Sequence, residues 1–518
     1  PAQNGKVQMY SASVSTYPDS SSSRIFLQEL KTKTDPGRPG RYSLKPLSDN
    51  EIKGKEPSFT SRQTIIRLDG GVQQIKLDRS KGEVVAFVNL KGNTNNDTFG
   101  IVKEANVNLN ADEWKKVLLP WTVRSPGNDD KFKSINREPG KYSQRYRIRD
   151  NGNRDLGDIV NSPIVAVGGY LATAANDGMV HIFKKNGGSD ERSYNLKLSY
   201  IPGTMPRKDI ESNDSTLAKE LRAFAEKGYV GDRYGVDGGF VLRQVEDRVF
   251  MFGAMGFGGR GAYALDLSKI NGNYPAAAPL FDVKDGDKNG KNGNNRVELG
   301  YTVGTPQIGK TQNGKYAAFL ASGYAAKKID DSTNKTALYV YDLKDTLGTP
   351  IAKIEAPGGK GGLSSPTLVD KDLDGTVDIA YAGDRGGNMY RFDLSNSDPN
   401  KWSAKAIFEG TKPITSAPAV SRLADKRVVI FGTGSDLSEE DVVGKDQQYI
   451  YGIFDDDNRT VNVKVTNGTG GGLLEQVLSE ENKILFLINN KASGGSADKG
   501  WVVKLREGER VTVKPTVV

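Results

Sequence analysis

The sequence predicts an all-β protein built as a β-propeller of about seven blades, six of which are visible as repeats. Two observations carry this prediction: a short strand pattern recurs along the chain, and a Pro-containing hairpin pattern precedes several of its copies. Helical patterns are scarce, and 60 glycines among 518 residues suit short strands joined by tight turns.

The recurring strand carries one large residue at an aligned position and usually a second one two residues later. This alternation is typical of a half-buried strand. The aligned residues are separated by 82, 76, 51, 61 and 51 positions, so the unit is about 51 residues long with insertions. The copies are MVHIF, AYALDL, LYVYDL, MYRFDL, IYGIFD and WVVKL, with aligned residues His181, Tyr263, Tyr339, Tyr390, Tyr451 and Val502.

The hairpin pattern consists of a small residue and a proline, a strand, a turn, a return strand and a Gly-rich corner. A unit of three or four antiparallel strands repeated at this period is a propeller blade. A β-sandwich with chance similarity is the alternative, and six phased copies disfavour it. The pattern occurs at 161–178, 304–323, 364–383 and 415–434.

The repeats divide the chain into two predicted parts. Residues 151–518 are expected to form the propeller, with six blades between about 155 and 510. Residues 1–150 do not show the repeat clearly and are expected to be an added β-rich part. Upstream strands such as EVVAFVNL can complete a seventh blade, because propellers often close with strands from both chain ends.

Two segments are exceptions with helical patterns. NADEWKKVLL can begin a helix with Asn110 as its N-cap, and Pro120 stops it. STLAKELRAFAEKG places Leu217 and Leu221 on one face and ends at Gly228.

Composition excludes several function classes. The chain has no cysteine, which excludes disulfides, thiolate metal sites and Cys nucleophiles. Its only histidine, His181, occupies an aligned strand position filled by tyrosine in four other copies, so it is predicted to be a packed strand residue. The net charge of +8 comes without a long Lys/Arg block, which argues against nucleic acid as a partner. No apolar run approaches 18 residues, and the absence of an initiator Met suggests a piece of a longer protein.

The segment DKDLDGTVD (370–378) places four carboxylates within nine residues around a glycine. Without a partner these carboxylates would repel one another, so we expect a hard cation between them. Oxygen ligands in this order suit Ca²⁺. The predicted ligands are the side chains of Asp370, Asp372, Asp374 and Asp378 and the backbone carbonyl of Thr376.

The flanks of this segment distinguish it from a helix–loop–helix calcium sensor. The sensor loop requires Glu at its twelfth position, where this chain has Tyr381. The flanking segments SSPTLV and IAYAG have strand patterns. The sequence therefore predicts a nine-residue metal loop inside a β-hairpin. A solvated Asp/Gly turn is the alternative, and four like charges so close together disfavour it.

A weaker echo of the loop lies at DGDKNGKNGNN, where Asp285, Asp287 and Asn289 have the correct spacing. The twelfth position is Arg296, which cannot bind a cation. A polar surface loop is the favoured interpretation, with a second weak metal site as the alternative.

The segment GTPQIGKT (304–311) matches the phosphate-loop pattern. That loop requires a helix after its last residue to offer backbone N–H groups to phosphate. Here Asn313 and Gly314 predict a hairpin turn into the strand YAAFLASG, so the segment is interpreted as a blade hairpin and nucleotide binding is not expected.

Several blocks in one order carry a resemblance to a known family. They are LGDIVNSPIVAVG, ATAANDGMVHIF, DRYGVDGGF, GRGAYALDL, LGYTVGTP, DLDGTVDIAYAGDRGGNMYRFDL and QQYIYGIFD. These blocks resemble the C-terminal domain of the PilC/PilY family of type IV pilus tip-associated proteins and are most similar to the neisserial PilC branch. The resemblance is dense from about 155 to 455.

The resemblance implies a modified β-propeller with a calcium loop of the DxDxDGxxD type, which carries over onto 370–378. It implies a role in pilus biogenesis, where calcium occupancy opposes retraction, and in adhesion to host cells. The implied partners are the pilus tip, through pilin or minor pilins, and a host-cell surface receptor. The implied location is exported, at the outer membrane or cell surface and the pilus tip, and no enzymatic activity is expected.

Two alternatives remain. The strands also resemble the repeats of quinone-cofactor dehydrogenases, but those enzymes typically carry repeated Trp-docking motifs and often a vicinal cysteine pair, whereas this chain has four tryptophans and no cysteine. A generic calcium-stabilised propeller scaffold is the other. The chain contains no Arg-Gly-Asp sequence, so integrin binding by that motif, known in some family members, is not expected.

Overall fold

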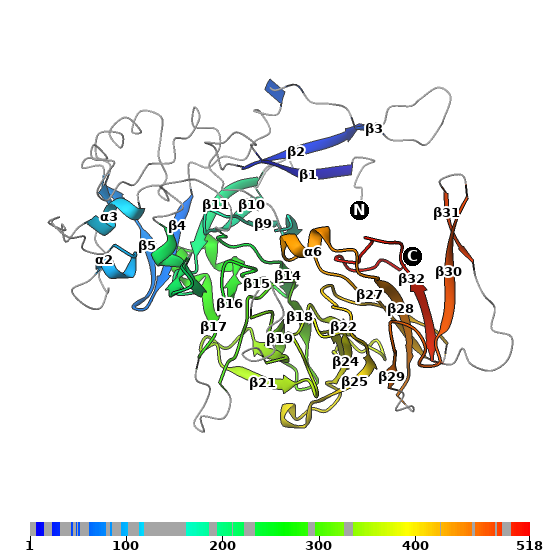
Figure 1. The fold of residues 1–518 in the computed structure, drawn as a ribbon. Helices are drawn as coiled ribbons and strands as arrows, with labels where there is room; N and C mark the ends of the chain where they lie inside the picture. The colour runs from blue at the N-terminus through cyan, green and yellow to red at the C-terminus, as the bar shows by residue number, and fades with distance from the viewer. Residues whose placement is uncertain are drawn as a thin grey trace. The chain divides into compact units, whose positions relative to one another are not determined.

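The structure is a computed structural model, and its strands are numbered in Figure 1. The residues it describes are 7–14, 23–31, 43–44, 48, 50–51, 62–78, 83–84, 95–101, 113–118, 162–185, 194–209, 211–221, 234–287, 296–325, 335–424, 426–457, 462–481, 484–488 and 499–517. Strands dominate these ranges and helices are few and short, as predicted.

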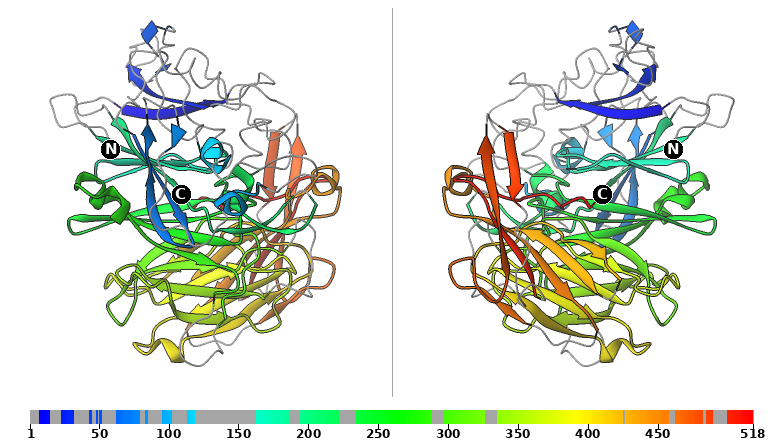
Figure 2. Two further views of the ribbon diagram at one scale, coloured as in Figure 1. Left: turned by 90° about the vertical axis from the view of Figure 1, so that its left-hand side faces the viewer. Right: turned by 90° about the vertical axis from the view of Figure 1, so that its right-hand side faces the viewer.

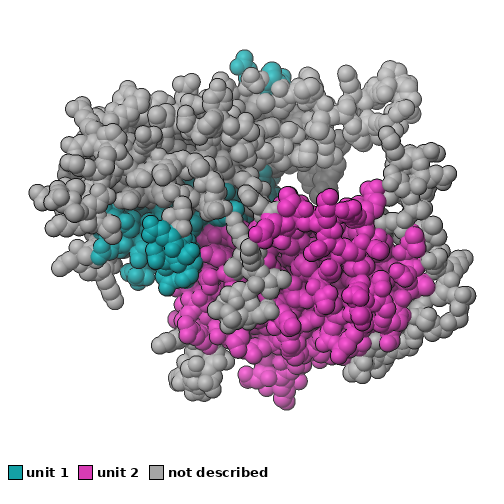
Figure 3. Space-filling model, viewed as in Figure 1, with its two compact units in different colours: residues 1–237, 242–251, 265–279 teal, residues 238–241, 252–264, 280–518 magenta. Residues whose placement is uncertain are grey.

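The chain divides into two compact units, which are coloured teal and magenta in Figure 3. The predicted domain boundary near residue 150 lies outside the described residues and stays a prediction. Unit 1 comprises Pro1–Asp237, Leu242–Met251 and Leu265–Pro279, and unit 2 comprises Gly238–Val241, Phe252–Ala264 and Leu280–Val518.

Small elements make up the first part of unit 1. Strands β1, β2 and β3 form a three-stranded antiparallel sheet, drawn in dark blue in Figure 1, and two short strand pairs and two short helices follow. Their bounds are β1 Val7–Val14, β2 Ser23–Lys31, β3 Ser43–Leu44, β6 Leu77–Asp78, β7 Glu83–Val84, α2 Asn95–Thr98, α3 Glu113–Leu118, β12 Pro206–Lys208 and β13 Asp214–Thr216.

The first blade-type sheet also lies in unit 1 and has the order β5-β4-β11-β10-β9-β8. Strands β8 to β11 form an antiparallel meander, and β4 joins it by parallel pairing with β11. The bounds are β4 Gln63–Leu68, β5 Gly71–Ile75, β8 Val165–Val167, β9 Tyr170–Ala174, β10 Val180–Lys185 and β11 Tyr194–Ile201.

An upstream strand therefore joins a blade, but it is not the strand proposed from the sequence. The segment QTIIRL forms β4, whose Ile65 and Ile66 are fully buried. The described part of EVVAFVNL, strand β7, pairs only with β6, and residues 85–90 of that segment lie outside the described residues. QTIIRL and EVVAFVNL both contain apolar strand residues, so the sequence alone does not show which of them joins the blade. The pairing of β4 with β11 identifies QTIIRL.

Four further sheets follow along the chain. Their strand orders are β14-β15-β16-β17, β18-β19-β20-β21, β22-β23-β24-β25-β29 and β26-β27-β28-β32-β30-β31. The bounds are β14 Phe240–Val245, β15 Arg248–Ala254, β16 Gly261–Asp266, β17 Pro279–Lys284, β18 Gln307–Lys310, β19 Tyr316–Ala321, β20 Ala337–Asp342, β21 Pro350–Glu355, β22 Thr367–Val369, β23 Ile379–Gly383, β24 Asn388–Asp393, β25 Ser403–Glu409, β26 Ala419–Arg422, β27 Arg427–Gly432, β28 Tyr449–Asp455, β29 Val463–Lys464, β30 Leu474–Glu481, β31 Ile484–Ile488 and β32 Gly500–Lys504. The short helices here are η3 Leu267–Asn271, η4 Pro275–Ala277, η5 Pro399–Lys401 and α6 Glu439–Val443.

The last three sheets lie in unit 2 and begin with antiparallel meanders, as blades do. The green, yellow and orange strands of these sheets follow one another in Figure 1, and Figure 2 shows the same succession from two sides.

One repeat copy has a different place from the one predicted. The repeat predicts a sixth blade at WVVKL, but this segment forms β32, which pairs antiparallel with β28, with Tyr451 opposite Val502. It is therefore the fourth strand of the fifth blade-type sheet in the described ranges and lies between β28 and β30. The third and fourth strands of a sheet have a similar alternation of apolar residues, so this pattern does not distinguish them. The other five copies are the third strands of their sheets.

The aligned residues of the repeat are buried in every copy. His181, Tyr263, Tyr339, Tyr390, Tyr451 and Val502 all have exposed fractions of 1% or less. His181 contacts Ser199 through Nδ1 at 2.7 Å and Asp177 through Nε2 at 3.1 Å. The prediction of a packed strand histidine is confirmed.

Both segments predicted to be helical contain helical residues, at 113–118 and 217–221. Helix α3 begins at Glu113, and Asn110 and Pro120 lie outside the described residues. In the second segment, β13 ends at Thr216 and residues 217–221 are helical. The hydroxyl of Thr216 accepts the N–H of Lys219 at 3.3 Å, which is the contact of an N-cap residue. Ser215 and Thr216, at the start of the segment predicted to be helical, therefore belong to strand β13.

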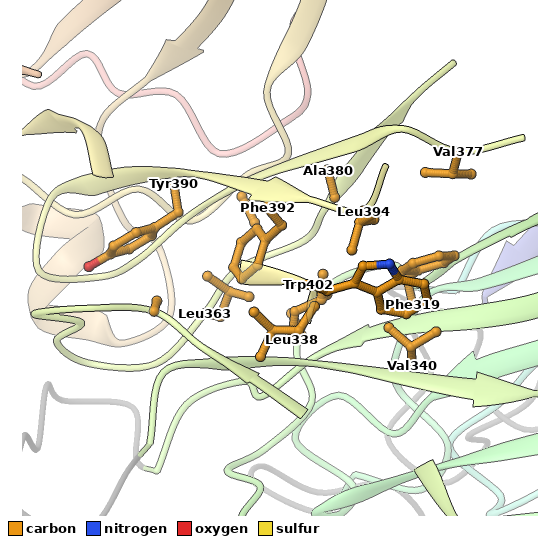
Figure 4. Packing of buried hydrophobic residues seen from close by; sticks show 14 of the residues in the cluster. Phe319, Leu338, Val340, Leu363, Val377, Ala380, Tyr390, Phe392, Leu394 and Trp402 are labelled. Carbon is orange, nitrogen blue, oxygen red and sulfur yellow. The ribbon is translucent and has the colours of Figure 1, made fainter. Parts of the chain in front are cut away.

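A hydrophobic core lies between two neighbouring sheets of unit 2 (Figure 4). Phe319 and Val340 come from the β18–β21 sheet, and Phe392 comes from the β22–β25 sheet; all three are fully buried. Burial of each such side chain contributes about 1.5–3 kcal/mol. Trp402 joins this core, and its indole N–H donates to the carbonyl of Asn396 at 2.7 Å. This core fixes β22 and β23, which carry the predicted metal loop.

The segment 304–311 forms a hairpin, as predicted. Strand β18 pairs antiparallel with β19, and the turn between them closes through the N–H of Thr311 and the carbonyl of Lys315. Gly314 in this turn has φ +77°. Since a strand follows where a phosphate loop needs a helix, the hairpin interpretation is confirmed. Within the part of the chain that the structure describes, no helix has the length and apolar character needed to cross a membrane.

Candidate metal centre

A β-hairpin positions the predicted metal loop. Strands β22 and β23 pair antiparallel, with Val369 opposite Ile379, and leave the nine residues 370–378 as the connection. The N–H of Asp378 donates to the carbonyl of Val369 at 2.9 Å and closes the base of the loop. The predicted nine-residue loop inside a hairpin is confirmed.

The structure brings all four predicted carboxylates together. Asp370, Asp372, Asp374 and Asp378 each offer one oxygen, and these oxygens lie within 4.8 Å of one another. Ca²⁺ binds oxygens at about 2.3–2.6 Å, so two ligands on opposite sides of the ion lie at most about 5.2 Å apart. The carboxylate cluster therefore suits a single calcium ion. The carbonyl of Thr376 as a fifth ligand stays a prediction.

Hydrogen bonds within the loop wrap the backbone around its first and third carboxylates. Asp370 accepts the N–H of Asp374 at 3.2 Å and the N–H of Gly375 at 2.8 Å. Asp374 accepts the N–H and the hydroxyl of Thr376 at 2.9 and 2.7 Å. The hydrogen bonds from Thr376 hold the pKa of the Asp374 carboxyl below its ordinary value. The hydrogen bonds thus orient both carboxylates before any cation arrives.

Two residues of the loop have left-handed backbone conformations. Gly375 has φ +88°, and a Cβ added there would meet no atom within 4 Å, so conformation alone calls for glycine. Leu373 has φ +58°, which costs a residue with a Cβ about 1–2 kcal/mol. Its side chain is 80% exposed. The turn of the backbone around Asp370 explains the positive φ of Leu373. It does not explain why the residue at this exposed position is apolar.

Asp378 is the buried member of the carboxylate cluster, with an exposed fraction of 4%. Burial raises the pKa of its carboxyl, and the negative charges of Asp372 and Asp374 act in the same direction. Its oxygens accept the N–H of Lys371 at 2.8 Å and the side-chain amide of Gln312 at 2.9 Å. A bound cation would oppose the repulsion that raises this pKa.

Gln312 is a functional candidate that sequence reasoning missed. It lies in the turn between β18 and β19 of the neighbouring sheet, and its amide nitrogen also lies 2.8 Å from the Thr376 hydroxyl and 3.3 Å from the Val377 carbonyl. The backbones are close as well, since the N–H of Val377 donates to the carbonyl of Lys310 at 2.8 Å. A Cβ on Gly309 would lie 2.5 Å from a methyl of Val377, so a glycine of the apparent phosphate loop serves this close approach.

An ionic network joins the other side of the loop to the last sheet. The Lys371 ammonium lies 3.0 Å from Asp457, whose carboxylate also accepts Arg391 at 2.8 Å and Arg427 at 2.9 Å. Burial acts to raise the pKa of Asp457, but the hydrogen bonds from Arg427 and Lys371 outweigh it and hold that pKa well below its ordinary value. Asp455 beside it accepts the hydroxyl of Tyr381. The loop is therefore held by neighbours on both sides.

The weaker echo of the loop has a structural use for its carboxylates. Asp285 accepts the N–H of Leu299 at 2.9 Å, and Asp287 accepts the N–H of Lys284 at 3.0 Å. Asn289 lies outside the described residues, so the hypothesis of a second weak metal site is untested. Among the residues that the structure describes, 370–378 holds the one cluster of three or more acidic or histidine side chains suited to a metal.

Comparisons with known proteins place these features in a family. A family model described as the PilY1 β-propeller domain matches residues 156–491, which is more than half of the chain. Type IV pilus biogenesis factor PilY1 of Pseudomonas aeruginosa strain PAO1 is 29% identical over 408 residues, covering 65% of this chain and 31% of that protein. A PilY1 homolog of Xylella fastidiosa is 28% identical over 320 residues, covering 55% of this chain and 19% of that protein.

Among solved structures, the crystal structure of the Pseudomonas aeruginosa PilY1 C-terminal domain matches with 24% identity and a TM-score of 0.49, covering 67% of this chain and 73% of that one. The chain spans about a third of the length of the curated Pseudomonas relatives, for which the coverage is 31% and 32%. The description of the matching family model confirms the predicted β-propeller.

Proposed function

The chain belongs to the PilY1 β-propeller family, and from this we propose that it carries the propeller of a type IV pilus biogenesis factor and binds one Ca²⁺ ion in the 370–378 loop. The relatives in Pseudomonas and Xylella are named as type IV pilus biogenesis factors, which supports the pilus assignment. The convergence of four carboxylates within 4.8 Å of one another is the observation that supports the metal assignment.

Calcium is proposed over magnesium because the loop supplies many oxygens on a turn. Mg²⁺ demands near-octahedral geometry and keeps several waters, whereas Ca²⁺ accepts six to eight oxygens in varied arrangements. When bound, the ion would offset the negative charge of the four neighbouring carboxylates. The side chains of Asp370, Asp372, Asp374 and Asp378 would hold it, with the Thr376 carbonyl as a further ligand.

The proposed consequence of binding is a fixed loop. Without the cation, repulsion among the carboxylates acts against the closed turn and is opposed only by screening and by the loop's hydrogen bonds. With the cation, the loop and its contacts with Gln312 and Asp457 are held together. We propose that this calcium-bound form engages the pilus tip and opposes retraction, as one of two states whose balance the ion shifts.

The finer features of the proposal follow the family resemblance. We propose an exported protein at the outer membrane, cell surface and pilus tip, with pilin or minor pilins and a host-cell surface receptor as partners. Adhesion to host cells and virulence belong to the same proposal. No catalytic role is proposed for any residue.

Piliation in engineered strains tests the function. Asp372→Asn removes one charge from an exposed position of the cluster and changes the shape of the side chain little. We expect this strain to lose surface pili and adhesion while the retraction motor is present, and to regain pili when the motor is deleted. Asp446→Asn, at an exposed carboxylate outside the loop, is the matched control and should leave piliation unchanged. Full piliation of the Asp372→Asn strain with an active motor would show that the loop does not control retraction.

A further inference from the structure

A groove beside the metal loop is not used by the proposed calcium site. It has a volume of about 1040 Å³ and lies within unit 2. Its walls are strand β22 with residues 370–373, strand β26 with residues 423, 424, 426 and 427, residues 456–457, and residues 514–517 near the C-terminal end of the described chain. Four separate segments therefore meet around one hollow.

Three exposed apolar side chains meet on this groove. Leu373, Leu423 and Val517 line it and are 80%, 41% and 45% exposed. They come from three different segments, and the partly buried Leu368 and Val420 contribute further apolar lining. Single exposed apolar residues are ordinary, but a group of them around one hollow marks an interaction surface.

The groove also carries cations that lack an acidic partner. Arg422 and Lys514 are exposed on its lining, and neither they nor Lys426 form an ion pair with any described residue. Lys426 instead lies over the ring of Phe454 at 4.0 Å. The two other lining cations, Lys371 and Arg427, are already paired with Asp457. Besides Asp457, the acidic lining residues are Asp370 and Asp372 of the loop and Asp456. The cations without an acidic partner therefore lie on β26, on the residues that follow it and on the segment 514–517.

We propose that this groove binds an extended peptide segment of a partner protein in which apolar and acidic side chains alternate. In an extended chain successive side chains point to opposite sides, so alternate apolar residues can enter the groove while the residues between them face its rim. The apolar side chains contact Leu373, Leu423 and Val517. The carboxylates meet Arg422 and Lys514, which gives the charge complementarity that selects an acidic over a basic segment.

This inference goes beyond the proposed function, and Asp370 and Asp372 are the predicted metal ligands that also line the groove. The acidic wall formed by Asp370 and Asp372 repels an acidic peptide, and a cation in the loop would reduce that repulsion. Peptide binding is therefore expected to be tighter with calcium present than after chelation. The groove is present without the ion, so peptide binding to the groove can be measured separately from calcium binding.

The test uses the purified chain and labelled eight-residue peptides, with fluorescence polarisation as the readout. The probe alternates leucine with glutamate, and the two comparison peptides alternate leucine with lysine and serine with glutamate. We expect saturable binding of the leucine–glutamate peptide alone, with a dissociation constant below ~1 mM. Leu423→Ser should weaken it about tenfold, since it removes a leucine contact from the groove. Leu347→Ser, at an 83% exposed leucine outside the groove, is the matched control and should leave binding unchanged.

A charge exchange gives a second readout that does not depend on the apolar contacts. The double variant Arg422→Glu with Lys514→Glu should lose the leucine–glutamate peptide and gain the leucine–lysine peptide. Absence of saturable binding, equal binding of the acidic and basic peptides, or binding insensitive to both Leu423→Ser and the charge exchange would overturn the docking proposal. A calcium-induced rise in Tm measured on the same protein shows whether the metal proposal stands when the docking proposal fails.

Discussion

The side-chain amide of Gln312 lies 2.9 Å from the Asp378 carboxylate and joins two neighbouring sheets at the metal loop. The same amide is within 3.3 Å of the Thr376 hydroxyl and the Val377 carbonyl, so one side chain contacts three consecutive residues of the loop. Gln312 is not a predicted ligand; it positions the residues that are.

Truncation of this side chain tests its positioning role. Gln312→Ala should leave the fold intact and weaken calcium binding about three- to tenfold, because the loop then loses a donor to its buried carboxylate. Calorimetric titration with Ca²⁺ measures the change. Asn400→Ala, at an exposed amide of η5 in the same unit, is the matched control. Equal affinities for the two variants would show that Gln312 does not position the loop.

Alanine substitutions at two glycines in comparable turns distinguish the cost of backbone strain from an effect on metal binding. Gly375 (φ +88°) lies in the β22–β23 loop and Gly314 (φ +77°) in the β18–β19 turn, and a Cβ at either position would meet no atom within 4 Å. Alanine at each position should cost a similar ~1–2 kcal/mol of unfolding free energy, since both changes force the same conformation on a residue with a Cβ. Denaturant unfolding measures that cost.

Only one of these glycine variants is expected to affect calcium. Gly375→Ala should weaken calcium binding, because relaxation of the turn moves the N–H groups that orient Asp370. Gly314→Ala should bind calcium as the unchanged chain does. A loss of affinity in both variants, or in neither, would contradict the assignment of the metal to the 370–378 loop.

The Asp457 network predicts a pH dependence of stability. Its carboxylate faces Lys371, Arg391 and Arg427, with Asp455 and Tyr381 beside them, and its pKa in the folded chain is held below the ordinary value. A carboxyl with a lowered folded pKa contributes stability that is fully present above its unfolded pKa of about 4 and is lost as the pH falls through the folded value. The Tm difference between the unchanged chain and Asp457→Asn should therefore be larger at pH 7 than at pH 3. The same difference at both values would show that the charge of Asp457 contributes nothing to folding.

Local patterns were sufficient to predict much of the fold and the carboxylate cluster of the 370–378 loop. The Asp spacing in 370–378 and the strand patterns on both sides depend on neighbouring residues only, so the loop and its hairpin followed from the sequence. The aligned tyrosines were predicted as half-buried strand residues for the same reason and are fully buried.

Contacts between distant segments could not be predicted in this way. Gln312 is 66 residues from Asp378, and Asp457 is 86 residues from Lys371, so each contact depends on how the sheets pack together. The parallel pairing of β4 with β11 and the place of β32 beside β28 likewise depend on partners that a single strand pattern does not specify. A glutamine in a turn and an aspartate after a strand carry no sequence signal for these roles.

Calorimetric titration of the purified chain with Ca²⁺ is the decisive measurement for a single calcium ion in 370–378. We expect one strong site, weaker binding of Mg²⁺, and loss of the site in Asp378→Asn but not in Asp446→Asn. Binding to the folded state alone adds about 2.7 kcal/mol of stability at 100 times Kd, so Tm should rise with calcium in the unchanged chain and not in Asp378→Asn. Unchanged calcium binding in Asp378→Asn, or equal affinity for Mg²⁺ and Ca²⁺, would show that 370–378 is not a calcium site.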